Sequence, residues 1–342
     1  MQTDAEAHTQ KRVGTPFRYP ALMFAPMFGS HLSIAGNMSN ALREAESLTF
    51  DTVQVFTKNQ QQWKAKPLEP AAIAEWTSEL KRLGWQGRTV SHASYLINLA
   101  SPDETLWEKS VTLMRDEIER CELLSIPFLV HHPGSFTTAT LDIGLSNIVR
   151  AHTRLLKETL GYRTVICFEG TAGSGNTIGG AFEHLATLRE RIAHASGTPD
   201  RLGFCLDTCH MHAAGYDLST RTSADAVLDQ FDALCGLRHV RALHLNDSKG
   251  SLASRLDRHT HIGCGFIGTG ATAHPGVVDE PATKAALKKS GFAAVLNRPE
   301  FQGIPMILET PKEDRAEGEP WDSVNLATLR GLVERTSAPS RA

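Results

Sequence analysis

The chain has 342 residues, of which 41% are hydrophobic and 21% charged. This is the composition of an ordinary globular protein, and the length is sufficient for a full core in one large domain or two. The formal charge of −3 excludes a globally basic nucleic-acid-binding protein, so any affinity for phosphates must come from a local patch or from bound cations.

Residues 1–21 mix acidic and basic residues with Gly and Pro, and they contain no apolar core. They fit neither a signal peptide nor a membrane span, and we expect a loose N-terminal tail. The six cysteines lack the dense, even spacing of a secreted disulfide framework, which favours a reducing compartment. The sequence therefore predicts a cytoplasmic protein with no membrane segment, and a flexible C-terminal tail over 336–342.

Eight short, apolar runs recur along the chain with helical-period stretches between them, the pattern of parallel strands joined by crossover helices. The predicted strands lie at 22–33, 51–57, 87–93, 126–132, 163–169, 201–207, 239–245 and 304–310. The predicted helices lie at 40–48, 71–84, 104–124, 145–161, 181–195 and 223–236. Eight such units predict an α/β fold, a (β/α)₈ TIM barrel over residues 22–335, with a doubly wound open sheet as the alternative.

The third to eighth runs each end in a side chain that can bind a metal, and three more candidates follow in loops. Because barrel strands deliver their carboxyl ends to one rim, these side chains should converge there. At the run ends are His92, His131, His132, Glu169, Asp207, His244 and Glu309, and in the loops are His210, Asp257 and His259. One of these residues alone would more often be a hydrogen-bonded or ion-paired group.

Convergent carboxylates would repel one another and raise each other's pKa, whereas divalent cations would keep them ionised. Imidazole nitrogens mixed with carboxylate oxygens suit Zn²⁺, with Mn²⁺ or Fe²⁺ as substitutes. With one side chain from each of the six run ends and three from the loops, nine ligands correspond to about two or three ions, because each ion takes three or four protein ligands and a carboxylate can bridge. Within 202–218, Cys209 and His212 lie beside Asp207 and His210, and spacing alone does not separate ligands from neighbours.

Several motifs along the chain resemble the deoxyribonuclease IV (endonuclease IV) family of zinc-dependent abasic-site endonucleases. They are GSHLSIAGN (29–37), VFTKNQQQW (55–63), SHASYLINLASP (91–102), HHPGS (131–135), FEGTAGSGNTIGG (168–180), CLDTCHMHAAGYDL (205–218), HLNDSKGSLASRLDRHTHIGCG (244–265) and ILET (307–310). The resemblance runs from about Phe28 to about Leu332, in order and with similar spacing.

The resemblance implies three Zn²⁺ ions per chain. One would be held by His92, His132 and Glu169, a second by the bridging, catalytic Glu169 with Asp207, His244 and Glu309, and a third by His210, Asp257 and His259. It places the remaining nearby groups as neighbours without a ligand role, namely His131, Cys205, Cys209, His212 and His261. Three Zn²⁺ would add +6 to the formal −3, giving about +3 with the change concentrated at one rim.

The family's activity implies a hydrolase of DNA repair, acting on double-stranded DNA with abasic sites or blocked 3′ ends. By a trinuclear zinc mechanism it would cleave the phosphodiester 5′ to the abasic site and leave a 3′-hydroxyl, and it would also clean 3′ ends. The damaged nucleotide would be flipped out, which costs least where no base exists. We expect a monomer, located in the cytoplasm and associated with the nucleoid when it acts on DNA.

Six residues are candidate DNA contacts. The resemblance implies that Tyr95 and Leu96 wedge into DNA at the lesion, and we expect phosphate contacts from a second set: Lys58, Asn59, Gln61 and Lys249. The chain departs from the family pattern at Gln61, where the family often has Arg, and at Gly170 and Cys264. Its segment 269–303 is also longer than the family's.

Two other classes of protein remain open. A metal-dependent sugar isomerase or epimerase on the same barrel would gather similar rim residues, although it needs fewer metals. A zinc-stabilised DNA-binding protein would need no open coordination position.

Within 269–301 we expect an irregular loop to about Pro281, bordering the catalytic face, and then a helix around a Gly break. Its lysines, Lys284, Lys288 and Lys289, would contact phosphates or lie solvated on an outer helix.

Overall fold

The computed structural model describes residues 25–272, 275–313 and 318–334. Eight strands form a closed barrel in the order β1-β12-β9-β8-β6-β4-β3-β2, and all neighbours pair in parallel. The strands are β1 (Met27–His31), β2 (Thr52–Val55), β3 (Val90–His92), β4 (Phe128–His131), β6 (Val165–Glu169), β8 (Leu202–Asp207), β9 (Val240–His244) and β12 (Pro305–Leu308). The predicted barrel is confirmed, and each strand lies inside its predicted run. The two terminal tails fall outside the described residues.

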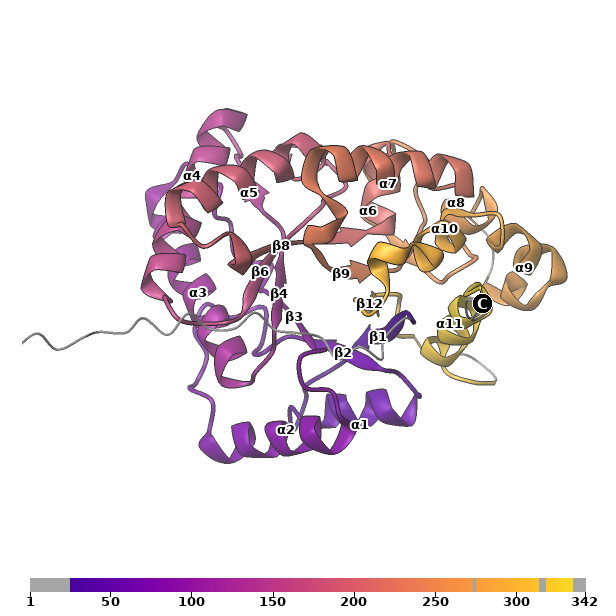
Figure 1. Ribbon diagram of the computed structural model, residues 1–342, viewed down its shortest axis with the longest axis horizontal. Helices are drawn as coiled ribbons and strands as arrows, with labels where there is room; N and C mark the ends of the chain where they lie inside the picture. The colour runs from indigo at the N-terminus through magenta and orange to yellow at the C-terminus, as the bar shows by residue number, and fades with distance from the viewer. Residues whose placement is uncertain (1–24, 273–274, 314–317, 335–342) are drawn as a thin grey trace, which may run out of the picture.

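Helices surround the barrel (Figure 1). They are α1 (Asn40–Ser47), α2 (Pro70–Leu83), α3 (Glu104–Leu123), α4 (Leu141–Glu158), α5 (Phe182–Ser196), α6 (Thr208–Ala214), α7 (Arg221–Cys235), α8 (Phe266–Thr269), α9 (Pro281–Leu287), α10 (Gly291–Asn297) and α11 (Trp321–Arg330). Short 3₁₀ turns lie at Pro199–Arg201, Leu237–His239, Pro275–Asp279 and Pro299–Phe301. No helix in these described ranges is long and apolar enough to cross a membrane.

Side-chain oxygens start several of these helices, because the first turn of a helix leaves backbone N–H groups without intrahelical acceptors. Asp103 accepts from the Leu106 N–H at 2.8 Å before α3. Thr220 and Ser223 bond reciprocally at the start of α7. Gly84 and Gly197 end α2 and α5 in left-handed conformations, where glycine avoids the steric cost of a Cβ atom.

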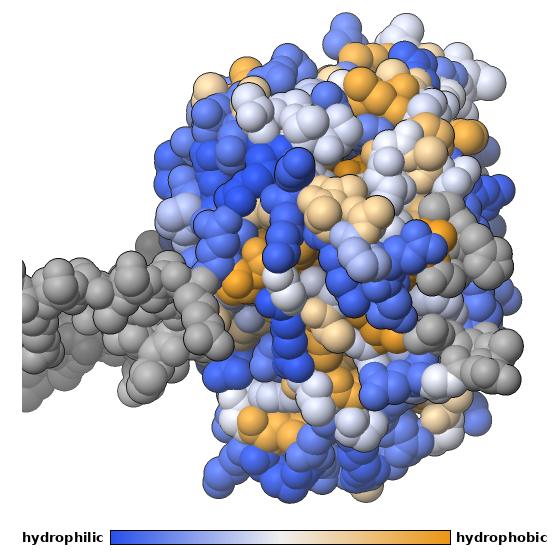
Figure 2. Space-filling model, turned by 90° about the vertical axis from the view of Figure 1, so that its right-hand side faces the viewer, coloured by the Kyte–Doolittle hydropathy of each residue, from blue (hydrophilic) through white to orange (hydrophobic). Residues whose placement is uncertain are grey.

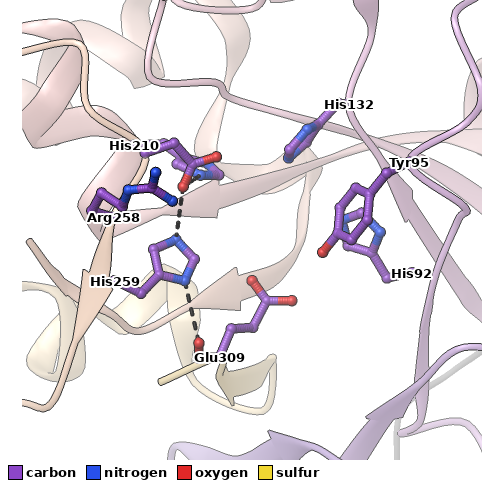
Figure 3. A pocket seen from close by; sticks show the side chains of 8 residues that line it. His92, Tyr95, His132, His210, Arg258, His259 and Glu309 are labelled. Carbon is purple, nitrogen blue, oxygen red and sulfur yellow. Dashed lines mark hydrogen bonds and ion pairs between the residues drawn. The ribbon is translucent and has the colours of Figure 1, made fainter. Parts of the chain in front are cut away.

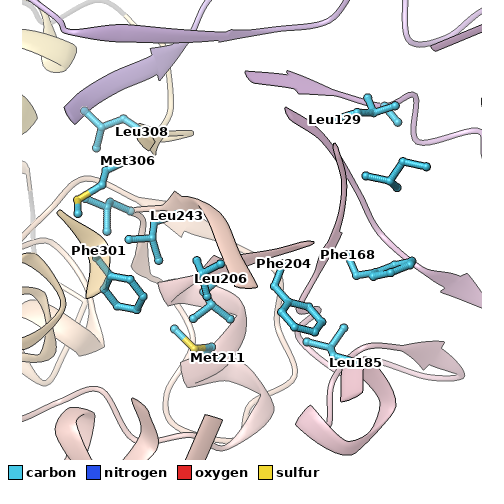
Figure 4. Close-up of a cluster of buried hydrophobic side chains, with 14 of the residues drawn as sticks. Leu129, Phe168, Leu185, Phe204, Leu206, Met211, Leu243, Phe301, Met306 and Leu308 are labelled. Carbon is cyan, nitrogen blue, oxygen red and sulfur yellow. The ribbon is translucent and has the colours of Figure 1, made fainter. Parts of the chain in front are cut away.

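The core around the barrel strands has two parts, as expected for strands whose side chains alternate between faces. The inner cluster fills the barrel and contains Val90, Phe128, Val130, Cys167, Cys205, Ala242 and Ile307. Alternate strand residues pack against the helices, as Figure 4 shows for Leu129, Phe168, Phe204, Leu206, Leu243 and Met306. On the outer face shown in Figure 2, small hydrophobic groups lie among hydrophilic residues. The two-part core therefore fixes which residues of each strand point inward.

The long segment before β12 contains helices α8, α9 and α10, and α10 starts at Gly291. The predicted helix with a break near this glycine is therefore confirmed, and residues 273–274 lie outside the description. Gly291 must be small, since its Cβ would lie 2.4 Å from the Leu218 carbonyl oxygen. The three lysines of the segment are exposed, and Lys284 lies 3.7 Å from Asp279. This position fits solvated lysines on an outer helix.

Candidate metal centre

The strand-end candidates point into the barrel because each follows an inner-cluster residue by two positions. His92 follows Val90 and Glu169 follows Cys167. The same spacing relates Val130 to His132, Cys205 to Asp207, Ala242 to His244, and Ile307 to Glu309. Since strand side chains alternate with a period of two, all six side chains are delivered to the interior at the carboxyl rim.

Asp207 has two structural roles, because it is both the last residue of β8 and the N-cap of α6. Its Oδ1 accepts a hydrogen bond from the His210 N–H at 2.9 Å. This cap fixes the first turn of α6, so His210 is held beside the strand-end side chains. The spacing Asp-x-x-His therefore connects a strand-end residue to a helix residue that also reaches the site.

The first group of candidate ligands surrounds one oxygen of Glu169. The Nε2 atoms of His92 and His132 both lie 3.1 Å from Glu169 Oε2. His92 and Glu169 are buried, whereas His132 is 32% exposed. The three donor atoms lie close enough together to hold one metal ion.

The second group surrounds His244 and uses the other oxygen of Glu169. His244 Nδ1 lies 2.9 Å from Glu169 Oε1, 3.1 Å from Glu309 Oε2 and 3.8 Å from Asp207 Oδ2. These four residues again form a set that could hold a metal ion. Because the two oxygens of Glu169 face different groups, this carboxylate can bridge two ions.

The third group comprises His210, Asp257 and His259. Asp257 Oδ1 lies 3.1 Å from His210 Nε2 and 3.5 Å from His259 Nε2. A small hairpin positions His259, because β10 (Asp247–Ser248) pairs antiparallel with β11 (His259–Thr260). The structure therefore brings all nine predicted side chains together, in the three groups that the resemblance implies.

Hydrogen bonds orient the imidazoles so that one nitrogen of each faces the carboxylates. Nδ1 of His92 and of His210 lies 2.8 Å and 2.9 Å from the backbone oxygens of Ala93 and Gly170. A carbonyl oxygen only accepts, so each Nδ1 carries the proton and Nε2 is left as the potential ligand atom. His259 has the same arrangement, with Nδ1 3.3 Å from the Glu309 backbone oxygen.

The electrostatics of the site show why cations fit it. Burial raises the pKa of Glu169, but the charges of His244 and His132 outweigh it, so this pKa lies well below its usual range. Burial lowers the pKa of His210, but the facing Asp207 and Asp257 outweigh it, so this pKa is raised well above its usual value. Among the described residues, no lysine or arginine forms an ion pair with Glu169.

Without cations, the charge of the carboxylates is therefore balanced by protons on imidazoles. A metal ion can replace such a proton, because it binds the same nitrogen and attracts the same oxygens. Nε2 of His210 and of His259 are buried and form no well-directed hydrogen bond in the described structure, although both lie near Asp257 Oδ1. The donor set of imidazole nitrogens and carboxylate oxygens fits Zn²⁺, Mn²⁺ or Fe²⁺.

Two cysteines also lie within reach of these groups, Cys205 near Glu169 and His244, and Cys209 near Asp207 and His259. Burial raises the pKa of both thiols to about 12. Both therefore stay protonated at neutral pH, whereas the carboxylates already carry charge. This difference favours the carboxylates as ligands.

The neighbouring histidines point to other surroundings. His131 lies outside the barrel, where its Nε2 is 3.2 Å from His152 Nε2 and its ring packs against Phe168. His261 stacks on Trp321 with 3.9 Å between ring centroids, and His212 Nδ1 accepts from the Leu218 N–H at 3.4 Å. None of the three belongs to a candidate metal group of the described residues.

Sequence reasoning missed three residues of the site, and two of them, Gln54 and His31, lie on barrel strands. Gln54 pairs in register with His31 and with Val90, so all three face the barrel interior. Gln54 Oε1 accepts from His244 Nε2 at 2.9 Å, and its Nε2 donates to Glu309 Oε1 at 2.6 Å. This acceptor keeps the proton on His244 Nε2 and leaves Nδ1 facing the carboxylates. The inward position of Gln54 is the signal that could have found it.

Asn246 was missed for a different reason. It lies after the end of β9, and its amide group is neither titratable nor one of the predicted ligand types. Its Nδ2 donates to Asp207 Oδ2 at 2.8 Å, and its Oδ1 accepts from the Glu309 N–H at 2.8 Å. The side chain is fully buried. Asn246 therefore connects Asp207 to Glu309 and holds both near His244.

A pocket of about 400 Å³ opens above the three groups. Figure 3 shows His92, Tyr95 and His132 on one side of it and His210, Arg258 and His259 on the other. The Tyr95 side chain is 60% exposed, and its ring packs edge-on against Phe56 with 5.8 Å between centroids. Leu96 is partly buried against the hydrophobic core. Tyr95 is thus an exposed aromatic ring at the mouth of the pocket.

The predicted phosphate contacts have different surroundings. Asn59, Gln61 and Lys249 are exposed. Lys58 is buried: its Nζ donates to the Gln62 backbone oxygen at 2.9 Å and lies 3.6 Å from a Glu117 carboxylate oxygen. Its ammonium group faces the protein, so this position does not support the phosphate contact expected for Lys58. It stabilises the loop after β2 instead.

The chain is similar to known proteins over most of its length. A family model described as a xylose isomerase-like TIM barrel matches residues 42–330. The chain is 45% identical to the probable endonuclease 4 of Chloroflexus aggregans over 314 residues, which cover 92% of this chain and 100% of that protein. The chain belongs to the endonuclease 4 family. The probable endonuclease 4 of Geotalea daltonii is 39% identical over 307 residues, covering 90% of this chain and 98% of that protein.

Solved structures with the same barrel fold also resemble this chain. Endonuclease IV from Thermus thermophilus superposes with a TM-score of 0.71 at 33% identity, covering 90% of this chain and 98% of that one. A D-tagatose 3-epimerase-like protein has a TM-score of 0.60 at 18% identity, covering 90% of this chain and 96% of that one. This second likeness shows a shared barrel fold alone.

Proposed function

We propose that this chain is a DNA repair endonuclease that hydrolyses the phosphodiester 5′ to abasic sites, leaves a 3′-hydroxyl and cleans blocked 3′ ends. The observation that carries the proposal is the set of three ligand groups in which Glu169 faces two groups with different oxygens. The family membership supports the same reaction. Hydrolysis of a phosphodiester needs several charges held close together, and three adjoining cation sites would supply them.

In this proposal each group holds one Zn²⁺ ion. His92, His132 and Glu169 hold the first, Glu169 with Asp207, His244 and Glu309 hold the second, and His210, Asp257 and His259 hold the third. When bound, the ions polarise the scissile phosphate, lower the pKa of water and stabilise the leaving oxygen. Mn²⁺ or Fe²⁺ would suit the same donors.

The chain's own residues position these groups. The bridging carboxylate of Glu169 sets the spacing between the first two groups, and Gln54 and Asn246 fix the orientation of His244 and Asp207. Such surrounding hydrogen bonds raise the basicity of the ligands and reduce their freedom to turn away. The catalytic role of Glu169 is therefore to keep the first two metal groups at a fixed separation.

The rim residues recognise double-stranded DNA. Tyr95 and the adjacent Leu96 enter the duplex at the lesion, where the missing base leaves space and lowers the cost of unstacking. Asn59, Gln61 and Lys249 contact phosphates, since all three are exposed near the carboxyl rim. Lys58 supports the loop that carries Asn59. We expect the protein to act as a monomer, which its elution volume in size-exclusion chromatography would test.

The test uses a 5′-labelled duplex with one abasic site and the metal-loaded protein. We expect a single cut on the 5′ side of the lesion, with a 3′ end that a DNA polymerase extends. The undamaged duplex is the control and should stay intact. Absence of incision, together with epimerisation of a free ketose, would replace the proposal with a sugar epimerase activity. Tight binding of the abasic duplex without incision would instead indicate a zinc-stabilised binding protein.

A further inference from the structure

A group of cations lies toward the amino end of the barrel strands, the end opposite to the metal groups. It comprises Arg189 on α5, Arg238 and His239 in the 3₁₀ turn before β9, and Arg241 on β9 itself. Arg241 precedes His244 by three residues, which is about 10 Å along a strand. We call these four residues the amino-face cluster. None of them belongs to a candidate metal group of the described residues.

Arg241 lies at an irregularity of the barrel sheet. Between Phe204 and Cys205 of β8, the pairing with β9 skips Arg241, which is therefore the extra residue of a β-bulge. A bulge changes the direction of a side chain, and bulges are often found next to functional sites. Gly203 lies beside the bulge, and a Cβ there would lie 2.7 Å from Arg241 Cγ. Both strands therefore leave room for this arginine.

The guanidinium groups of the cluster have no carboxylate partner among the described residues. Arg241 donates to the backbone oxygens of Arg238 and Val240 at 2.8 Å and 3.0 Å. The Arg189 side chain donates one long hydrogen bond, 3.4 Å to the Pro199 oxygen, and its Nε is buried without a partner in the described structure. Arg238 is exposed, and its side chain donates no hydrogen bond to the described part of the chain. Most donors of the cluster are therefore free for an anion.

The charges of the cluster repel one another. Burial, followed by the charges of Arg238 and Arg241, lowers the pKa of Arg189 below its usual value. Burial and the charges of the three arginines lower the pKa of His239 to about 4, so His239 is neutral at pH 7. Asp200 opposes both effects, but it forms no ion pair within the described ranges. A bound anion would remove the cost of this repulsion.

We propose that the amino-face cluster is an anion site that binds a doubly charged phosphate group. The planar guanidinium groups of Arg189, Arg238 and Arg241 match phosphate oxygens, and neutral His239 has one further N–H to donate. Two sources carry this group, a free phosphate anion and the terminal phosphate of a DNA strand. The inference goes beyond the proposed function and does not depend on it, because the cluster lies outside the metal groups.

The measurement uses the zinc-loaded protein with isotope-labelled arginine, in which NMR detects the Nε–H group of each arginine. Inorganic phosphate is the probe. The resonances of Arg189, Arg238 and Arg241 should shift together and saturate with one dissociation constant of about 1 mM or below, as expected for several charged hydrogen bonds. Arg258 lines the metal pocket, so its resonance separately reports phosphate that binds at the metal centre.

A double variant with a matched control tests the same site. Arg189→Gln with Arg238→Gln should weaken phosphate binding by about tenfold or more at the remaining Arg241 resonance. Zinc content and incision of an abasic duplex should stay unchanged, because neither arginine contacts a metal group. Lys288→Gln with Lys289→Gln is the control, since it removes the same charge from two exposed lysines elsewhere, and it should leave the dissociation constant unchanged.

Two undamaged duplexes identify the source of the phosphate. If a duplex with 5′-phosphate ends shifts the cluster resonances and the same duplex with 5′-hydroxyl ends does not, the site binds DNA ends. Shifts with inorganic phosphate alone assign it to a free anion. Shifts that rise without saturation, or a control variant that weakens binding as much as the cluster variant, would overturn the proposal, since general screening of charge would explain them. A response confined to Arg258 would also overturn it, because phosphate would then bind at the metal centre alone.

Discussion

Gln54 offers a sharp test of how the second metal group is held. Its amide oxygen is 2.9 Å from His244 Nε2 and its amide nitrogen is 2.6 Å from Glu309 Oε1. Replacing Gln54 with Leu keeps the volume of the side chain and removes both hydrogen bonds. His244 could then turn or exchange its tautomer, and its Nδ1 would no longer be held toward Glu169.

The expected loss of metal affinity follows from these two contacts. Loss of a partner in the surroundings of a metal ligand commonly costs about 10- to 100-fold in metal affinity, which is about 1.4 to 2.7 kcal/mol. In the metal-free protein, the buried His244 N–H without an acceptor should lower the free energy of unfolding by about 1–3 kcal/mol. Only the zinc affinity of the second group should fall, because Gln54 contacts no residue of the third group.

The assay is a competitive titration of zinc with a chromophoric chelator, followed by incision of an abasic duplex at saturating zinc. Gln230→Leu is the control, since Gln230 is exposed on α7. One zinc ion should become weaker in the Gln54 variant and the others should keep their affinity. Unchanged zinc affinity together with incision within about twofold of the unmodified protein would refute the positioning role of Gln54.

Four further predictions follow from the site. The purified chain should carry about three zinc ions per molecule by elemental analysis and incise an abasic duplex without added Mg²⁺; activity that survives full chelation and returns only with Mg²⁺ would contradict this. Glu169→Gln should lower incision far more than His212→Ala, because Glu169 bridges two groups, and equal losses would mean that the ligand assignment is wrong. The pKa of His210 is raised in the metal-free fold, so protonated His210 should stabilise the folded protein fully below about pH 6.5. This stabilisation should be lost as the pH rises through the pKa that His210 has in the folded protein. Thermal unfolding of the metal-free protein at pH 6 and pH 9 would show this, and a higher melting temperature at pH 9 would contradict it. Deleting residues 270–282 should leave the zinc content intact and change DNA affinity and its salt slope modestly; lost zinc would show that this segment supports the third site.

The deletion is expected to spare the third site because a different contact holds it. Asp247, fully buried, accepts hydrogen bonds at 2.9 to 3.3 Å from five backbone N–H groups, those of Ser248, Gly263, Gly265, Ile267 and Gly268. These bonds secure the chain that follows His259 before residue 270 begins. The close approach of Asp247 to this backbone requires glycine at 268, where a Cβ would lie 2.6 Å from Asp247 Oδ2.

The strand ends of the site could be predicted from the sequence because their positions follow from local rules. A strand alternates its side chains, and a parallel barrel brings all the carboxyl ends to one rim. His92, Glu169 and Asp207 lie at strand ends, so one pattern was enough to place them together. The separation of His132 from His131 follows from the same alternation, because adjacent residues face opposite sides of the sheet.

Other residues could not be placed by such rules, because their roles depend on distant partners. Lys58 was expected at the surface, but Glu117 on α3 supplies a buried carboxylate 3.6 Å away. No local pattern in the loop after β2 contains that information. Gln54 occupies a position of β2 whose side chain faces the barrel interior, yet its role depends on His244, which reaches it only when the barrel closes. Local periodicity therefore predicts which side chains enter the site, whereas the groups that orient them follow from closure of the barrel.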